Sequence, residues 1–228
     1  MLVGNVMRLM LFRQYKDGAP VSRSDLNSVV YANFPKKQAL AAAVIALSQA
    51  RFLTSLGLHL KELEKTKRTE SLTDVKKRVA AAVAGDKSTK VFVLRSALPL
   101  ALRAKVDTQR DITVQGFTLA VLGLVHLAGE GGLPEAKLHS YLAALGVQLA
   151  GGDKHPQLGD AGDLLGSLVK QRYLQRNKVT TPAGEQWVLE LAENGLDEVG
   201  TPRLDAWVKS LVASSAVMTV DDDDEDEA

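Results

Sequence analysis

The chain has 228 residues, of which 46% are hydrophobic and 24% are charged, and it contains no cysteine. Since domains commonly span about 100 to 200 residues, this length allows one domain or two small ones. The lack of cysteine excludes disulfides, thiolate metal ligands and a cysteine nucleophile.

The acidic residues are unevenly distributed. The net charge is only +1, but seven of the 27 acidic residues lie in residues 221–227. The rest of the chain therefore has 28 basic against 20 acidic residues, an excess of +8. Much of this excess is local, since residues 61–110 hold 13 Lys and Arg against six Asp and Glu. A basic body with an acidic tail points to a polyanionic partner.

We expect no targeting or membrane-spanning segment. The longest strongly apolar run, Phe117–Leu127, is well short of the roughly 18 to 20 residues that a transmembrane helix needs. The N-terminal residues 1–10 lack the long apolar stretch and the small-residue cleavage site of a signal peptide. We therefore expect an intracellular protein with no membrane partner.

Three helices are predicted in the first half of the chain. Apolar residues recur over residues 2–12 with the spacing of a half-buried helix. Ser22, three residues before Asp25, matches a capping signal and predicts the start of a short second helix. An alanine-rich stretch keeps the helical spacing over residues 40–55 and predicts the third helix.

A β-hairpin is predicted after these helices. Apolar and polar residues alternate over residues 58–63, and residues 91–94 form a second strand candidate. The basic segment 65–88 between them is interpreted as an enlarged hairpin loop that carries a short helix. Three helices followed by a hairpin is the element order of a winged-helix domain.

The second half repeats this element order without repeating the sequence. Helices are expected at residues 117–125, 134–145 and 161–171, with Pro134 at a first helical position, and strands at residues 173–179 and 186–191. Thr201-Pro202 opens a last helix. Its expected apolar face consists of Leu204, Trp207, Val208, Leu211 and Val212.

Together these elements predict a mainly α fold with small β-hairpins, arranged as tandem winged-helix domains. Domain A is expected at residues 1–105, including the hairpin loop 65–88, and domain B at residues 106–215. A disordered acidic tail is expected at residues 216–228, because like charges repel and residues 221–227 include no apolar side chain.

The residues that could support catalysis or metal binding do not form a known pattern. His126 lies in an apolar stripe and is predicted to be a core residue, and no histidine has a second ligand three or four residues away. The Asp-rich loop 151–163 lacks the ligand spacing of a calcium loop, and Asp160 is expected to cap the following helix. No phosphate-binding loop or nucleophile elbow is present. We therefore expect no metal, no cofactor and no enzymatic activity.

Four basic residues surround the end of the third helix of the second half and the start of its hairpin: Lys170, Arg172, Arg176 and Lys178. Winged-helix proteins commonly contact a phosphate backbone in this region, which would give affinity without sequence preference. An ordinary solvated face explains the same residues equally well. The cluster at residues 76–78 in the hairpin loop is likewise ambiguous.

The second half carries motifs that are specific in their order and spacing. They are Gly116–Val125, Gly131–Glu135, Leu145–Val147, His155–Asp160, Leu164–Leu165 and Leu168–Leu174. Over about 60 residues this series resembles the MAGE homology domain. In the first half, Lys16–Val21, Arg23–Leu26 and Leu56–Leu63 are similar to the family's opening winged helix, so the resemblance covers most of residues 1–200.

Two departures from the family pattern make the chain more similar to one branch of the family than to another. The segment ending in Trp-Gly-Pro-Arg that many animal members carry after the last hairpin is replaced by Glu190–Glu193, and the first hairpin loop is longer than usual. Both features are more similar to the single-copy branch of lower eukaryotes and plants, non-SMC element three of the SMC five/six complex, than to the expanded mammalian group.

The resemblance implies a non-catalytic scaffold in a nuclear, chromatin-associated complex for chromosome maintenance, DNA repair and recombination. It implies a RING-type ubiquitin-ligase subunit bound to the first half and a kleisin bound to the second. It also implies contact with double-stranded DNA without sequence preference and an indirect association with the SMC heads. The alternatives are a MAGE-type ligase regulator that acts away from DNA and a stand-alone winged-helix DNA-binding regulator.

Candidate residues for the RING contact follow from the same resemblance, and those for the kleisin follow from the apolar stripes of the second half. Family members contact the RING protein through adjacent apolar residues on the first helix, which match Met10-Leu11 or Leu11-Phe12 here, although these could instead be core residues. Partner helices dock into apolar grooves. The kleisin candidates are Leu165, Leu168, Val169, Trp207 and Leu211, most of which must also serve the core.

Overall fold

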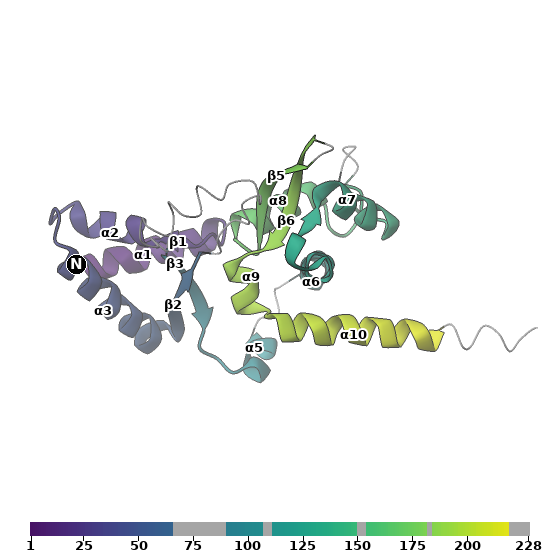
Figure 1. Ribbon diagram of the computed structural model, residues 1–228. Coiled ribbons are helices and arrows are strands. Elements are labelled where there is room, and N and C mark those ends of the chain that lie inside the picture. Colours follow the sequence, from purple (N-terminus) through teal and green to yellow (C-terminus); the bar gives the residue numbers. More distant parts are fainter. Residues whose placement is uncertain (66–89, 107–110, 150–153, 182–183, 219–228) are drawn as a thin grey trace, which may run out of the picture.

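The computed structural model describes residues 1–65, 90–106, 111–149, 154–181 and 184–218 (Figure 1). These residues form a mainly helical fold with two small antiparallel sheets, as predicted. The predicted hairpin loop 65–88 falls almost wholly outside the described residues, and so does most of the predicted tail.

The first half consists of α1 (Leu2–Lys16), β1 (Val21–Ser22), α2 (Arg23–Tyr31), α3 (Gln38–Leu56), β2 (Leu58–Glu64) and β3 (Lys90–Ser96). The predicted cap is confirmed, because the backbone N–H of Asp25 donates to Ser22 Oγ at 3.1 Å. Gly57 ends α3 with φ +61°, a left-handed conformation that glycine adopts without steric cost, and the chain turns into β2. The three strands form one sheet in the order β1-β3-β2.

The core of the first half lies between its helices and this sheet. α1 supplies Val6 and Met10, and α2 supplies Leu26 and Val30. The remaining buried members are Val21, Ala41, Val44, Ile45, Phe52, Leu60, Phe92 and Leu94.

By length and composition alone, α3 is long and apolar enough to cross a membrane, which the sequence analysis did not anticipate. The same helix supplies four side chains to the core of the first half.

The second half begins after α5 (Leu100–Val106), a helix that the sequence analysis did not predict. It consists of α6 (Ile112–Leu127), a 3-10 turn (Gly129–Gly131), β4 (Leu133–Pro134), α7 (Glu135–Ala144), α8 (Ala161–Lys170), β5 (Leu174–Thr181), β6 (Gly184–Leu191), α9 (Glu193–Glu198) and α10 (Thr201–Met218). Its sheet has the order β4-β6-β5. From α1 to β3 and again from α6 to β6, the element order is that of a winged-helix domain.

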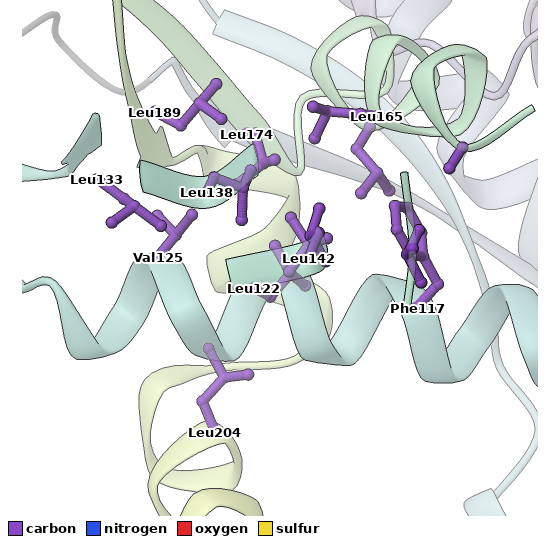
Figure 2. Packing of buried hydrophobic residues seen from close by; sticks show 14 residues of the cluster. Phe117, Leu122, Val125, Leu133, Leu138, Leu142, Leu165, Leu174, Leu189 and Leu204 are labelled. Carbon is purple, nitrogen blue, oxygen red and sulfur yellow. The ribbon is translucent and has the colours of Figure 1, made fainter. Parts of the chain in front are cut away.

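The second core is built on α6 (Figure 2). Phe117, Leu122 and Val125 face the side chains of α7, α8 and the β5–β6 hairpin, whereas Leu204 of α10 lies on another side of α6. α10 crosses α6 closely, since a Cβ added at Gly123 would lie 2.7 Å from Cζ3 of Trp207.

Several local expectations for the second half can now be compared with the structure. Asp160 caps α8, because its Oδ1 accepts the Asp163 N–H at 2.9 Å, as predicted. Pro134 is the residue before α7 rather than its first residue. The prediction of a core His126 is wrong, because the side chain is partly exposed and its Nε2 lies 2.7 Å from Asp205 Oδ1 of α10.

Candidate functional site

An apolar face on the last two turns of α1 points away from the core. The predicted candidate Met10 is buried in the core, whereas Leu11 is partly exposed and the Phe12 side chain is 68% exposed. Tyr15, which the sequence analysis did not single out, is 93% exposed and lies one helical turn beyond Leu11. At about 100° per residue, the three exposed side chains fall within roughly one third of the helix circumference. We call Leu11, Phe12 and Tyr15 the α1 face.

The basic cluster of the second half is largely compensated by acidic residues. Nε and Nη2 of Arg172 each donate at 2.8 Å to one carboxylate oxygen of Glu193, the first residue of α9. The Glu193 side chain is only 4% exposed. This bidentate pair fixes the turn between α8 and β5 against α9, so the Arg172 guanidinium is engaged inside the chain.

The two cations on β5 are more exposed but also paired. Nε and Nη2 of Arg176 lie 2.9 and 2.7 Å from Oε2 of Glu135, and Arg176 Cζ lies 4.4 Å from the ring centroid of Trp187. Lys178 pairs with Glu185 across the hairpin, a contact between exposed side chains that contributes little to stability. Lys170 is the last residue of α8 and is exposed.

The predicted kleisin residues divide into buried and exposed groups. Leu165 and Leu168 belong to the core of the second half, and Val169 is partly buried against it. Trp207 is half-buried beside Gly123 of α6. The Leu211 side chain is 48% exposed, and the neighbouring Val212 is more exposed still. The accessible apolar surface among these residues therefore lies on α10, and we call Leu211 and Val212 the α10 face.

The Asp-rich loop can be compared with the metal hypothesis only in part, because Asp153 lies outside the described residues. Asp160 serves as a helix cap, and Nδ1 of His155 accepts the backbone N–H groups of Gln157 and Leu158 at 3.2 Å. Among residues 1–65, 90–106, 111–149, 154–181 and 184–218, no three His, Asp or Glu side chains are grouped to hold a metal ion.

Comparison with known proteins decides the family. The profile of the MAGE homology domain matches residues 6–202. The chain belongs to the MAGE homology domain family. A comparison with curated proteins gives no match. Among solved structures, this MAGE protein is similar to a chain of an "Nse1-Nse3-Nse4 complex", with a TM-score of 0.68, 19% sequence identity, and coverage of 93% of this chain and 89% of that chain.

The structure adds groups that the sequence analysis missed. Tyr15 extends the α1 face, and its i+4 spacing from Leu11 could have identified it. Glu193 and Glu135, the partners of Arg172 and Arg176, lie 21 and 41 residues away along the chain, so local patterns give no signal for these pairs.

Proposed function

We propose that this MAGE protein is a non-catalytic scaffold subunit of the SMC five/six chromosome-maintenance and DNA-repair complex in the nucleus. It bridges a RING-type ubiquitin-ligase subunit and a kleisin, contacts double-stranded DNA, and through the kleisin is associated with the SMC heads. The observation that carries the proposal is the presence of two exposed apolar faces, one on each half. The α1 face adjoins the first core and the α10 face the second, so each half can hold a partner of its own.

The α1 face is the proposed docking surface for the RING subunit. Phe12 and Tyr15 expose large aromatic surfaces, and such residues commonly dominate the binding energy of an interface. Phe12→Asp should abolish co-purification with the RING subunit and leave thermal unfolding close to that of the wild type. Leu47→Asp is a matched control, because Leu47 is also exposed in the first half but lies on α3. Equal loss of binding in both variants would refute the assignment.

The α10 face is the proposed docking surface for a kleisin helix. Truncation after Gly200 would be a poor test, because it removes Leu204 from the core of the second half. Leu211→Asp changes an exposed side chain instead and should abolish kleisin binding while the RING subunit stays attached. Ile112→Asp is the matched control, since Ile112 is an exposed apolar residue on α6 of the same half. Unchanged kleisin binding by Leu211→Asp would exclude the α10 face.

The proposed DNA surface consists of Lys170, Arg176 and Lys178, with Arg172 in a supporting position. Replacement of Lys170, Arg176 and Lys178 by Ala should weaken binding to random duplex DNA about equally for all sequences. It should also lower the slope of log affinity against log salt by about 0.9 for each phosphate that these side chains neutralise. Wild-type affinity and slope in this variant would exclude the surface and make residues 76–78 the next to test.

One observation favours a second function, a MAGE-type regulator of a RING ubiquitin ligase that acts away from DNA. Arg172, Arg176 and Lys178 all have carboxylate partners, which lowers the local excess of positive charge. The two functions differ in duplex DNA binding. Salt-dependent binding by the purified chain supports the scaffold function, and its absence supports the second.

A further inference from the structure

The two halves of the chain meet through polar side chains. Among the described residues, neither of the two large clusters of buried apolar residues contains members from both halves, and a third, small cluster consists of Leu63, Val91 and Val93 on β2 and β3. The first of two contacts is made by α9, which lies between the β2–β3 hairpin and the body of the second half (Figure 1). The six residues of α9, Glu193–Glu198, include three carboxylates.

Arg95 of β3 is the centre of this contact. Its side chain is only 18% exposed. Nη1 lies 3.1 Å from Oε2 of Glu198, Nε lies 3.4 Å from Oδ2 of Asp197, and Nη2 donates to Oδ1 of Asn194. Lys61 of the adjacent strand β2 pairs with the same Asp197, whose side chain is 13% exposed. Two cations of the first half thus face the acidic side of α9.

A second contact lies at the turn after α1. Nε2 of Gln171 donates to the backbone carbonyl of Asp17 at 3.0 Å, and the carbonyl of Gln171 accepts from Nδ2 of Asn194 at 2.7 Å. Gly18, the residue after Asp17, has φ +65°, and a Cβ there would lie 3.2 Å from Gln171 Nε2. Asn194 therefore joins the two contacts, since it bonds both Arg95 and Gln171.

We propose that Arg95, Lys61 and the α9 residues that face them form a polar clamp that holds the two halves in one orientation and releases them when its charges are screened. Interfaces between domains of one chain permit relative motion unless they are large and hydrophobic, and the contacts between these halves are ion pairs and hydrogen bonds. Salt weakens the exposed part of the clamp most, namely the pair of Lys61, which is 51% exposed, with Asp197, and it weakens the more buried pairs of Arg95 less. Release leaves both halves folded and joined by the segment that contains α5.

The clamp sets the orientation of the two halves relative to each other. On the proposed function, the α1 face and the α10 face hold different partners, so the orientation of the halves fixes the placement of those partners relative to each other. An anionic ligand that competes for Arg95 and Lys61 would have the same effect as salt. The clamp itself involves only residues of this chain, and it can be tested without any partner.

The test is a distance measurement between spin labels on the full chain. Because the chain has no cysteine, the paired substitutions Ala39→Cys on α3 and Ala143→Cys on α7 give two unique, exposed labelling sites, one on each half. Pulsed electron resonance at low salt should give one narrow distance peak. Arg95→Gln or Asp197→Asn should abolish that peak and give a broader, longer distribution, and high salt should broaden the peak of the wild-type clamp.

Arg23→Gln is the matched control, because Arg23 forms an ion pair with Glu62 inside the first half at 3.3 Å. It removes the same charge and should leave the peak unchanged. A far-UV spectrum and thermal unfolding of the Arg95→Gln chain show whether both halves remain folded, and the salt titration tests the clamp even if that variant does not fold. A peak that survives Arg95→Gln, Asp197→Asn and high salt would overturn the proposal. A failure of the partner-binding tests would leave these distances unaffected, so the two outcomes are distinguishable.

Discussion

Arg172 pairs with Glu193, and replacing Arg172 distinguishes a structural role of this residue from a DNA-binding role. Arg172 has φ +60°, a left-handed backbone conformation that costs a residue other than glycine about 1 to 2 kcal/mol. The chain tolerates this cost at a site where the side chain makes two 2.8 Å hydrogen bonds to a buried carboxylate. Removal of the guanidinium should therefore destabilise the second half.

The expected loss of stability follows from the burial of this ion pair. Breaking a buried ion pair by removing one partner costs about 3 to 5 kcal/mol. Because the Arg172 side chain is 21% exposed and water can enter its place, we expect Arg172→Ala to cost about 3 kcal/mol, at the lower end of that range. At this chain length the destabilisation corresponds to a fall of about 6 to 12 °C in the melting temperature.

A second variant isolates the backbone contribution. Arg172→Gly also removes the guanidinium, but glycine adopts the positive φ freely, so this variant should be about 1 kcal/mol more stable than Arg172→Ala. Urea unfolding monitored by circular dichroism measures both variants, and duplex DNA binding is measured on the folded protein. If Arg172→Ala keeps wild-type stability and loses DNA affinity, the guanidinium is a phosphate contact and the structural argument is refuted.

Three further predictions concern packing and charge. Gly123→Ala should displace α10 and cost about 1 to 3 kcal/mol, because the new Cβ would lie 2.7 Å from Cζ3 of Trp207, and the change should be visible in tryptophan fluorescence. The control Gly116→Ala, whose new Cβ would meet no atom of another element within 4 Å, should be neutral or stabilising, and equal destabilisation would contradict the argument. Leu204→Ala should cost about 2 to 5 kcal/mol in urea unfolding, since the side chain is fully buried, and a cost well below this would mean that α10 contributes little to the core. Deletion of Asp221–Ala228 removes seven negative charges and should strengthen duplex DNA binding, most at low salt, in a filter-binding or anisotropy titration; unchanged affinity at low salt would show that the tail does not compete with DNA.

The main helices and hairpins could be predicted from the sequence because their signals are local. The helical spacing of apolar residues predicts α1, α3 and α6 to within a few residues, and the caps at Ser22 and Asp160 depend on a residue only three positions away. The two-residue strands β1 and β4 carry no such signal. They exist because each pairs with a distant strand, β3 or β6, once the fold has brought the two together.

The candidate sites were likewise predicted from the sequence only in part. The family resemblance predicted a docking role for the first helix, but only the orientation of α1 on its core decided that Met10 is buried and that Phe12 is exposed. Leu165 and Leu168 have the apolar character of a docking surface, and tertiary packing places them inside the core instead.

What the sequence by itself determined about this protein is its periodic elements, its distribution of charge and its resemblance to the MAGE family, since each of these is written in residues that are close along the chain. Only the tertiary structure decided which charged side chains pair inside the chain and which remain accessible to a partner. Arg172 and Arg95 look like ordinary surface cations in the sequence, but the fold places carboxylates against them from residues 21 and about 100 positions away. A charge that is paired and partly buried inside the chain contributes to stability and to the orientation of the halves, whereas the same charge facing water remains available to a partner.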